Sequence, residues 1–504
     1  MCTNYIHHFR RKHHAQRVHH VPQGHIIAFI AVMYMKRIIL VLLSVFLFSL
    51  NVFAADIIGQ WHGVLKEHGV YLKVILNIAK SAGGYEYAAT FDSPRQNAKG
   101  IPVTSFIFEG NSLKFRIIEL GIEYRGSLEE DGIIKGIFEQ NGLAFTVNFS
   151  REEIKRPQEP SKPYPYIEKE VRFENKAAGI TLSGTLTIPR GSKKQSFPAV
   201  VLISGSGPNN RDEEVFGHKP FLVIADYLTR NGIAVLRYDK RGTGRSSGTV
   251  KGSTTEDFAA DAAAAVEYLK TRKEIDANNI GLIGHSEGAA IAAMIAAKQK
   301  RIMFIVLLAG QGLPGKEIIL KQKKMIGKVS KVKKKELKRE IETTKNVINI
   351  VGMANTGRQR GELLQYLGKR YDGFTHKEVP KGVGKPDFMR SYISTYMDPW
   401  MRYFLSYNPA DDLKEVKCPV LALGGSKDLQ VSAKDNLQAI KEVLEKSGNP
   451  DVTVKMYHGL NHMFQECKTG LPSEYPFIDQ TFSPNVLSDI LEWIKERIIK
   501  KSGE

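Results

Sequence analysis

Cysteine is scarce in this chain, which has three in 504 residues. So few cysteines exclude a scaffold held together by disulfides, and the spacing of zinc ligands is missing as well. Cys418 and Cys467 are the two that lie outside the N-terminal region. Because Cys418 adjoins a predicted core strand, we expect both to be free thiols.

Several other signatures are missing. The main apolar stretch, residues 38–50, is shorter than the roughly 20 residues that a membrane-spanning helix needs. There is no P-loop or dinucleotide-binding fingerprint, and no basic segment studded with aromatic residues indicates nucleic-acid binding. The 42% hydrophobic and 25% charged residues that are present are typical of a globular protein, long enough here for two domains.

The N-terminal region predicts export. Met-Lys-Arg at residues 35–37 gives a basic start, residues 38–50 form an apolar run broken by two serines, and Val52 and Ala54 are the small residues of a cleavage site. Together they indicate a secretory signal peptide over residues 35–54. We expect a periplasmic or secreted protein with no stable membrane anchor after cleavage.

Residues 1–34 precede this signal peptide, which is normally the first segment translated. We interpret them as an upstream extension before a natural start at Met35. Their three histidine pairs resemble metal ligands, but they fall in this extension and we assign no metal site to them. Removing residues 1–54 takes away six basic residues and no acidic ones, so the formal net charge falls from +19 to +13.

A small antiparallel β domain is predicted for residues 56–151. Short alternating segments such as LKFRIIEL and LAFTVNF are separated by turns rich in glycine and asparagine, a pattern typical of a small barrel or sandwich. The predicted β domain contains no cluster of histidines and carboxylates, so we expect it to have a packing or substrate-positioning role. Residues 152–166 hold four prolines and predict a semi-rigid linker.

From residue 167 to 504 buried strands alternate with helices, which predicts a mostly parallel sheet covered by helices on both faces. In such sheets the functional groups collect at the carboxyl ends of the strands. Between residues 311 and 410 no buried strand is predicted, only helical and irregular polar segments. An insertion of this length is usually a functional lid.

The most specific motif is the pentapeptide Gly284-His285-Ser286-Glu287-Gly288, which follows an apolar strand and opens a helix of small residues. In that context G-x-S-x-G is the turn that lifts a nucleophilic serine out of a sheet. We expect the side chain of His285 to point away from Ser286.

A serine hydroxyl needs a base to accept its proton. His462 lies just beyond the last predicted strand, and we prefer it to His458 at the end of that strand. Asp428 follows the penultimate strand and gives the order serine, aspartate, histidine. Asp411 and Asp412 are weaker candidates because they precede that strand.

Two backbone N–H groups are expected to form an oxyanion hole. One belongs to Glu287, directly after the nucleophile. The other is assigned to Ser206, with Gly207 possible, in the loop after a buried strand. The charged loop around Asp239 and Arg241 is interpreted as structural.

These segments resemble the α/β-hydrolase superfamily, specifically bacterial carboxylesterases and serine-aminopeptidase-like hydrolases with a small N-terminal β domain. The resemblance covers residues 170–500 and is carried by SGSGPNNRD, YDKRGTGRSSG, GHSEG, GGSKD and GLNH. It implies acyl transfer through a covalent acyl-serine that water then hydrolyses, with no cofactor and no metal. The lid matches no specific pattern, so the resemblance does not extend to the substrate.

We therefore expect a carboxylesterase for small acyl esters, using Ser286, Asp428 and His462. An aminopeptidase or amidase is the alternative, and a non-catalytic binding protein on the same scaffold is disfavoured because all three side chains are present. Residues 316–340 carry eleven Lys and Arg against three Glu, which favours neutral or anionic substrates unless the run is a solvated helix face. The oligomeric state is left open.

Overall fold

A computed structural model of the chain describes residues 57–66, 72–81, 87–93, 96, 98–152, 156–190, 196–352, 356–370 and 383–502. The upstream extension and the signal peptide predicted for residues 1–54 lie outside the described residues. Among the helices that are described, none combines the length and the hydropathy of a segment that crosses a membrane.

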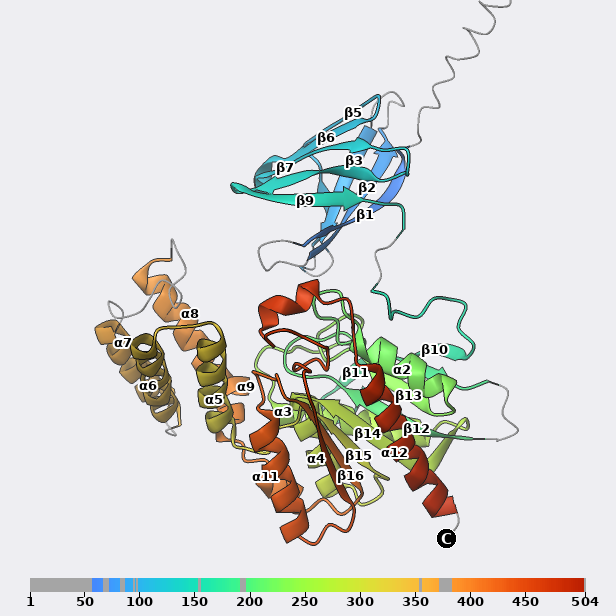
Figure 1. Cartoon of the computed structure of the whole chain (residues 1–504), viewed down its shortest axis with the longest axis vertical. Helices are drawn as coiled ribbons and strands as arrows, with labels where there is room; N and C mark the ends of the chain where they lie inside the picture. The colour runs from blue at the N-terminus through green and yellow to red at the C-terminus, as the bar shows by residue number, and fades with distance from the viewer. Residues whose placement is uncertain are drawn as a thin grey trace, which may run out of the picture. The chain divides into compact units, whose positions relative to one another are not determined.

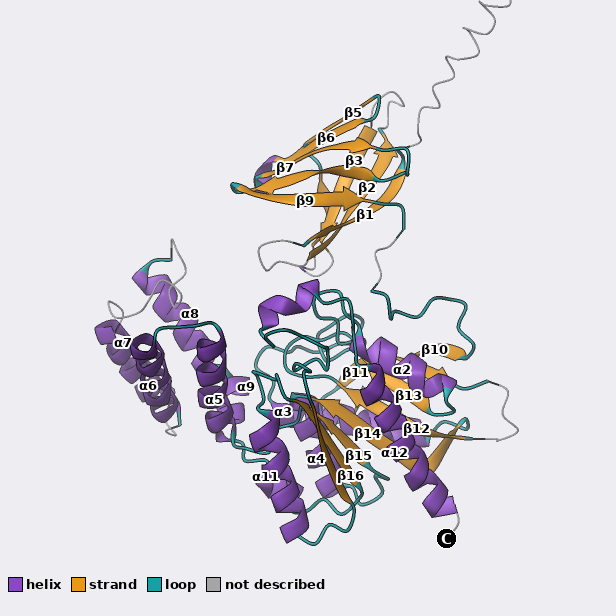
Figure 2. Ribbon diagram, in the orientation of Figure 1, coloured by secondary structure: helices purple, strands orange, loops and turns teal. Residues whose placement is uncertain are grey.

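The N-terminal β domain consists of two antiparallel sheets (Figure 2). The first contains β1 (Gly59–Leu65), β2 (Leu72–Lys80), β3 (Tyr87–Ser93) and β4 (Ala98–Pro102), and the second contains β5 (Ser105–Glu109), β6 (Ser112–Ile117), β7 (Ile122–Leu128), β8 (Ile134–Gln140) and β9 (Leu143–Phe149). Alternate side chains point inward, so that Phe91 of the first sheet meets Phe115 and Phe138 of the second at centroid distances of 6.2 and 6.0 Å. The two sheets therefore share one aromatic core.

The C-terminal domain is built on an eight-stranded sheet in the order β10-β11-β13-β12-β14-β15-β16-β17. Its strands are β10 (Ile167–Asn175), β11 (Ile180–Ile188), β12 (Phe197–Ile203), β13 (Ala234–Tyr238), β14 (Ile275–His285), β15 (Ile305–Leu308), β16 (Val420–Gly425) and β17 (Val452–Tyr457). The pairs β10–β11 and β11–β13 are antiparallel and the remaining pairs are parallel. The central strands are buried along their length, which explains their continuous apolar sequence.

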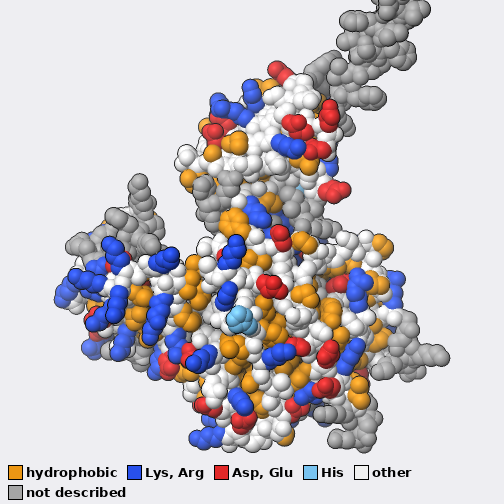
Figure 3. All heavy atoms as spheres, viewed as in Figure 1, with side chains coloured by type: hydrophobic (Ala, Val, Ile, Leu, Met, Phe, Trp, Pro, Cys, Tyr) orange, Lys and Arg blue, Asp and Glu red, His pale blue; other side chains and the backbone are white. Residues whose placement is uncertain are grey.

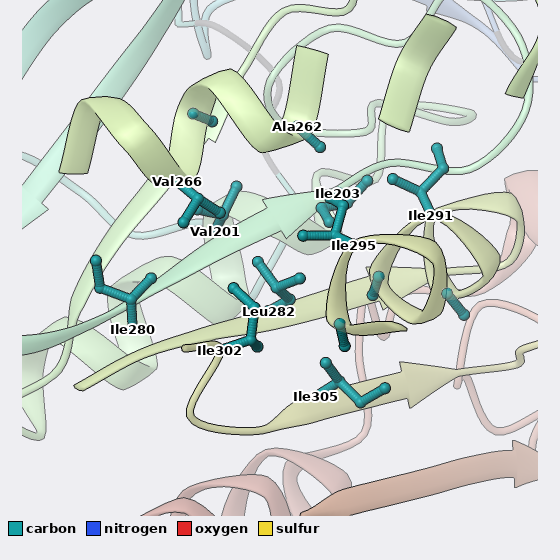
Figure 4. Packing of buried hydrophobic residues seen from close by; sticks show 14 of the residues in the cluster. Val201, Ile203, Ala262, Val266, Ile280, Leu282, Ile291, Ile295, Ile302 and Ile305 are labelled. Atoms are coloured by element: carbon teal, nitrogen blue, oxygen red, sulfur yellow. The ribbon is translucent and has the colours of Figure 1, made fainter. Parts of the chain in front are cut away.

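Helices cover both faces of this sheet (Figure 1). One apolar cluster joins the sheet to α3 (Thr255–Lys270), α4 (Glu287–Lys298) and α11 (Ala433–Lys446), and a second joins it to α2 (Pro220–Arg230) and α12 (Pro484–Ser502). In the first cluster, Val201 of β12 and Leu282 of β14 pack against Val266 and Ile295 of the covering helices (Figure 4). The alanines of α4 let that helix lie close to the strands that carry the site.

The described residues of the insertion between β15 and β16 form six helices: α5 (Gly315–Val329), α6 (Lys334–Val351), α7 (Thr356–Arg370), α8 (Lys385–Met397), α9 (Pro399–Ser406) and α10 (Ala410–Leu413). We call residues 311–410 the lid. It has its own apolar cluster, which includes Val347, Leu363 and Ile393. The described residues confirm the predicted fold class: a small all-β part, then a mostly parallel sheet with a helical insertion.

Candidate active site

Ser286 lies at the sharp turn between β14 and α4 with φ 55° and ψ −116°, a backbone conformation that costs energy for a residue with a side chain. The two glycines that flank the turn, Gly284 and Gly288, have no room for a β-carbon. A β-carbon on Gly284 would lie 2.0 Å from the Gly288 carbonyl oxygen, and one on Gly288 would lie 2.0 Å from the Ile203 carbonyl oxygen. The turn therefore presents a partly exposed serine at the carboxyl end of β14 and the N-terminus of α4.

Asp428 and His462 form a buried pair. The Asp428 Oδ2 atom lies 2.7 Å from His462 Nδ1, and Asp428 Oδ1 accepts the N–H groups of Gln430 and Val431 at 2.8 Å each. A carboxylate held in this way keeps the proton of neutral His462 on Nδ1, so the lone pair is on Nε2. The rival His458 is exposed.

His285 connects the serine turn to the loop of His462. Its Nε2 lies 3.0 Å from the His462 carbonyl oxygen, and the centroids of the two imidazole rings are 4.9 Å apart. Because Ser286 follows His285 directly, this bond holds the backbone beside the nucleophile against the backbone of the base. The other ring nitrogen, Nδ1, lies 3.0 Å from Glu213 Oε1, so the side chain is committed to these two partners.

The two contacts of His285 indicate that it is an imidazolium. Both ring nitrogens face acceptors, a carboxylate and a carbonyl, and neutral imidazole has only one N–H to donate. Burial lowers the pKa of His285, but the charge and hydrogen bond of Glu213, together with the His462 carbonyl and the charge of Asp428, outweigh burial and raise that pKa. The Glu213–His285 pair was not predicted from the sequence.

The loop after β12 is fixed from several sides. Gly205 donates its N–H to Glu213 Oε1 at 2.6 Å, and its carbonyl oxygen accepts Lys240 Nζ at 2.7 Å and Asn209 Nδ2 at 2.8 Å. A β-carbon on Gly205 would lie 3.3 Å from the Ser286 β-carbon, so this loop borders the nucleophile. Since the Gly205 N–H is engaged by Glu213, the next donor along the loop is Ser206, the residue predicted for the oxyanion hole.

Glu287, whose N–H is the second predicted donor, is the first residue of α4, where an N–H has no partner within the helix. Its buried carboxylate accepts three hydrogen bonds, from Thr255 Oγ1 at 2.7 Å, Lys240 Nζ at 3.0 Å and the Trp400 indole Nε1 at 2.6 Å. Trp400 belongs to α9, so the residue after the nucleophile is tied to the lid. Sequence reasoning did not find this network.

The charged side chains of the loop after β13 form ion pairs with neighbouring elements, and Lys240 pairs with Glu287 as described above. Asp239 binds the Arg211 guanidinium at 2.8 Å, and Arg241 binds the buried Asp261 at 2.7 Å. These ion pairs fasten the loop to neighbouring elements and account for its charged sequence without a ligand.

Removing the Glu213 carboxylate should destabilise the protein. In Glu213→Gln the buried imidazolium loses its counter-charge, and breaking such a pair costs about 3–5 kcal/mol of unfolding free energy. The raised pKa of His285 also makes the free energy of unfolding depend on pH. The stabilisation by the ion pair is complete below pH 6.5, the ordinary pKa of histidine, and is lost as pH rises through the higher pKa of His285 in the folded protein.

Urea unfolding between pH 6 and pH 9 measures both effects. Wild type should lose stability over the alkaline part of this range, and Glu213→Gln should lack that loss. The adjacent Glu214→Gln is the matched control, because Glu214 contacts Asn210 and not His285. Equal pH profiles for wild type and Glu213→Gln would contradict the imidazolium assignment.

Comparison with known proteins gives a consistent result. The model of the serine aminopeptidase S33 family matches residues 219–354. Esterase EstD of Thermotoga maritima is 30% identical over 305 residues, which are 59% of this chain and 61% of that esterase. With the sheet order and the serine turn, these matches decide the fold. The described part of residues 167–502 has the sheet order and the serine turn of the α/β-hydrolase fold.

Other similar proteins match shorter or less identical parts of the chain. The thiohydrolase apmlB of Arthrinium phaeospermum is 34% identical over 141 residues, 27% of this chain and 41% of that protein. The alignments therefore span about three fifths of the length of EstD and two fifths of the thiohydrolase. Solved structures similar to the chain include the Pyrococcus furiosus esterase Pf2001, with a TM-score of 0.40, 18% identity, and coverage of 68% of this chain and 97% of that one. Another is the hydrolase GrgF of Penicillium sp. sh18, with a TM-score of 0.42, 17% identity, and coverage of 66% of this chain and 99% of that one.

Proposed function

We propose that this α/β-hydrolase is a serine hydrolase that cleaves carboxylic esters of small acyl substrates. The observation that carries the proposal is the buried pair of Asp428 and His462, joined through His285 to the strained turn of Ser286. This arrangement provides a nucleophile, a base and an acid that orients the base.

The mechanism follows from the donors and acceptors of these groups. His462 Nε2 accepts the proton of Ser286 as its oxygen attacks the ester carbonyl, and Asp428 stabilises the imidazolium that forms. The N–H groups of Glu287 and Ser206 bind the developing oxyanion. His462 then protonates the leaving alcohol, and the same groups activate a water molecule that releases the acid from the acyl-serine.

Peptide or amide cleavage is the second candidate, because the matching family model is named for serine aminopeptidases. An aminopeptidase pocket needs carboxylates to hold the substrate's ammonium group. The similarity to an esterase favours ester cleavage instead.

A panel of substrates separates the two candidates. Purified protein should hydrolyse p-nitrophenyl acetate and p-nitrophenyl butyrate, and should leave aminoacyl-p-nitroanilides uncut. If the anilides are cut and the esters are not, the peptidase assignment replaces the esterase assignment. If neither class is cut while a fluorophosphonate still labels the protein, the error concerns the substrate and not the nucleophile.

We also propose that the enzyme is exported and acts in the periplasm or outside the cell. The proposal rests on the basic start, apolar run and small residues of the signal peptide at residues 35–54. In a bacterial host the mature protein should begin at Ala55, as read by intact-mass measurement. Ala54→Phe should block that cleavage, because the −1 position accepts only small side chains, whereas Asn51→Gln should be processed normally. Cytoplasmic protein with an uncut N-terminus would overturn the assignment.

A further inference from the structure

The lid contains a cavity of about 1360 Å³ that the proposed reaction does not use. Residues from α6, α7, α8 and α9 line it, together with Lys316 of α5 and Thr254 before α3. Pockets for small ligands usually have volumes of about 300–1,000 Å³, so this cavity is large enough for an extended molecule.

The charge of the lining has one sign. Four basic side chains line the cavity: Lys316, Arg360, Arg390 and Arg402. No Asp or Glu is among its described lining residues. Arg390 is already paired with Asp387. For Lys316, Arg360 and Arg402, the described residues supply no carboxylate partner. Positive charge collected in one concave site raises the local concentration of anions.

The rest of the lining is largely apolar. The aliphatic side chains are those of Ile348, Val351, Leu364, Ile393, Met397 and Leu405. Leu364 is 43% exposed, and several of the others belong to the lid's apolar cluster. An apolar wall beside unpaired guanidinium groups matches a ligand with an apolar chain and one anionic end.

This site differs from the solvated basic faces of α5 and α6. Blue side chains gather on the surface over these helices in Figure 3. Lys334, Lys335 and Lys338 of α6 are exposed and do not line the cavity. Arg402, in contrast, is half-buried on α9 and lines the cavity.

We infer that the lid cavity binds an amphipathic anion of the medium- or long-chain carboxylate class, with its head group at Arg402 and Arg360 and its chain along the aliphatic wall. This binding does not depend on the chemistry of Ser286. Helix α9 connects this cavity to the active site. Pro399, Arg402 and Leu405 of α9 line the cavity, and Trp400 of the same helix donates a hydrogen bond to the Glu287 carboxylate.

Calorimetric titration of the full chain carrying Ser286→Ala with decanoate tests the inference without turnover. Decanoate should bind, and decanol, which has the same chain and no charge, should bind at least tenfold more weakly. Arg402→Gln should weaken decanoate binding about tenfold, since a charge-assisted pair is lost. Lys338→Gln removes one lid charge outside the cavity and should change decanoate affinity by less than about twofold.

Decanol also reports whether the cavity survives the substitution: its affinity should be the same with and without Arg402→Gln. The inference is overturned if decanoate binds no more tightly than decanol, or if Lys338→Gln weakens decanoate as much as Arg402→Gln does. Because the protein in this titration lacks the nucleophile, either result leaves the proposed ester hydrolysis untouched.

Discussion

Replacing Ser286 by Ala should lower ester turnover by roughly a millionfold, the loss seen when the nucleophile of a comparable serine triad is removed. The expected effect is large because the serine oxygen forms the covalent bond, and no neighbouring hydroxyl lies on the strained turn. Stopped-flow and long-time assays with p-nitrophenyl acetate cover the required range of rates.

Ser488→Ala is the matched control for that experiment. Ser488 lies on α12 and its hydroxyl donates to Glu492, so its loss should leave turnover within about twofold of wild type. Far-UV circular dichroism of both variants should be that of the wild type. Retention of more than a few per cent of wild-type turnover by Ser286→Ala would show that another group attacks the substrate.

Asp428→Asn should reduce kcat by about ten thousandfold while the protein remains folded. The amide oxygen of asparagine can still accept the N–H groups of Gln430 and Val431, so the loop is expected to persist. Its NH₂ group would face His462 Nδ1, however, and would favour the tautomer with the proton on Nε2. That tautomer cannot accept the proton of Ser286.

Asp411→Asn is the corresponding control, since Asp411 was one of the two weaker candidates for the acid and forms an exposed ion pair with Lys414. Its kcat should stay near the wild-type value. If the two substitutions had equal effects, Asp428 would not be the orienting acid. A loss confined to KM in Asp428→Asn would argue for a role in substrate binding instead.

The sequence was most informative where local signals and fold rules agree. The serine turn could be predicted because its glycines, its strand and its helix are contiguous, and because a β-carbon at Gly284 or Gly288 has no room. Asp428 and His462 could be selected because each directly follows a strand of the parallel sheet, where side chains from distant segments meet. The lid was visible as a long stretch without a buried strand.

Side-chain networks could not be read in the same way. Glu213 and His285 are 72 residues apart, and Trp400 and Glu287 are 113 apart, so neither pair has a spacing that sequence reasoning can recognise. Glu213 looked like one acid among several in a polar loop. A buried acid is costly unless it is paired, and only the folded structure shows that Glu213 and Glu287 are both buried and paired.

Through Glu287, the hydrogen bond of Trp400 is expected to affect turnover, and substitution can measure this effect. Trp400→Phe removes the indole N–H while keeping the aromatic stack with Phe404, whose ring centroid is 5.5 Å away. Because Glu287 supplies an oxyanion donor in the proposed mechanism, kcat should fall by about tenfold with little change in KM. Phe404→Leu, which disturbs the stack but not the hydrogen bond, should preserve kcat.

The proposed mechanism requires Ser286 to be the nucleophile. A fluorophosphonate probe should add one phosphonyl group to the full-length or processed protein, and peptide mapping by mass spectrometry should locate it on Ser286. An adduct on a different residue, or no adduct in protein that hydrolyses the ester panel, would contradict the assignment of Ser286, His462 and Asp428 as the catalytic groups.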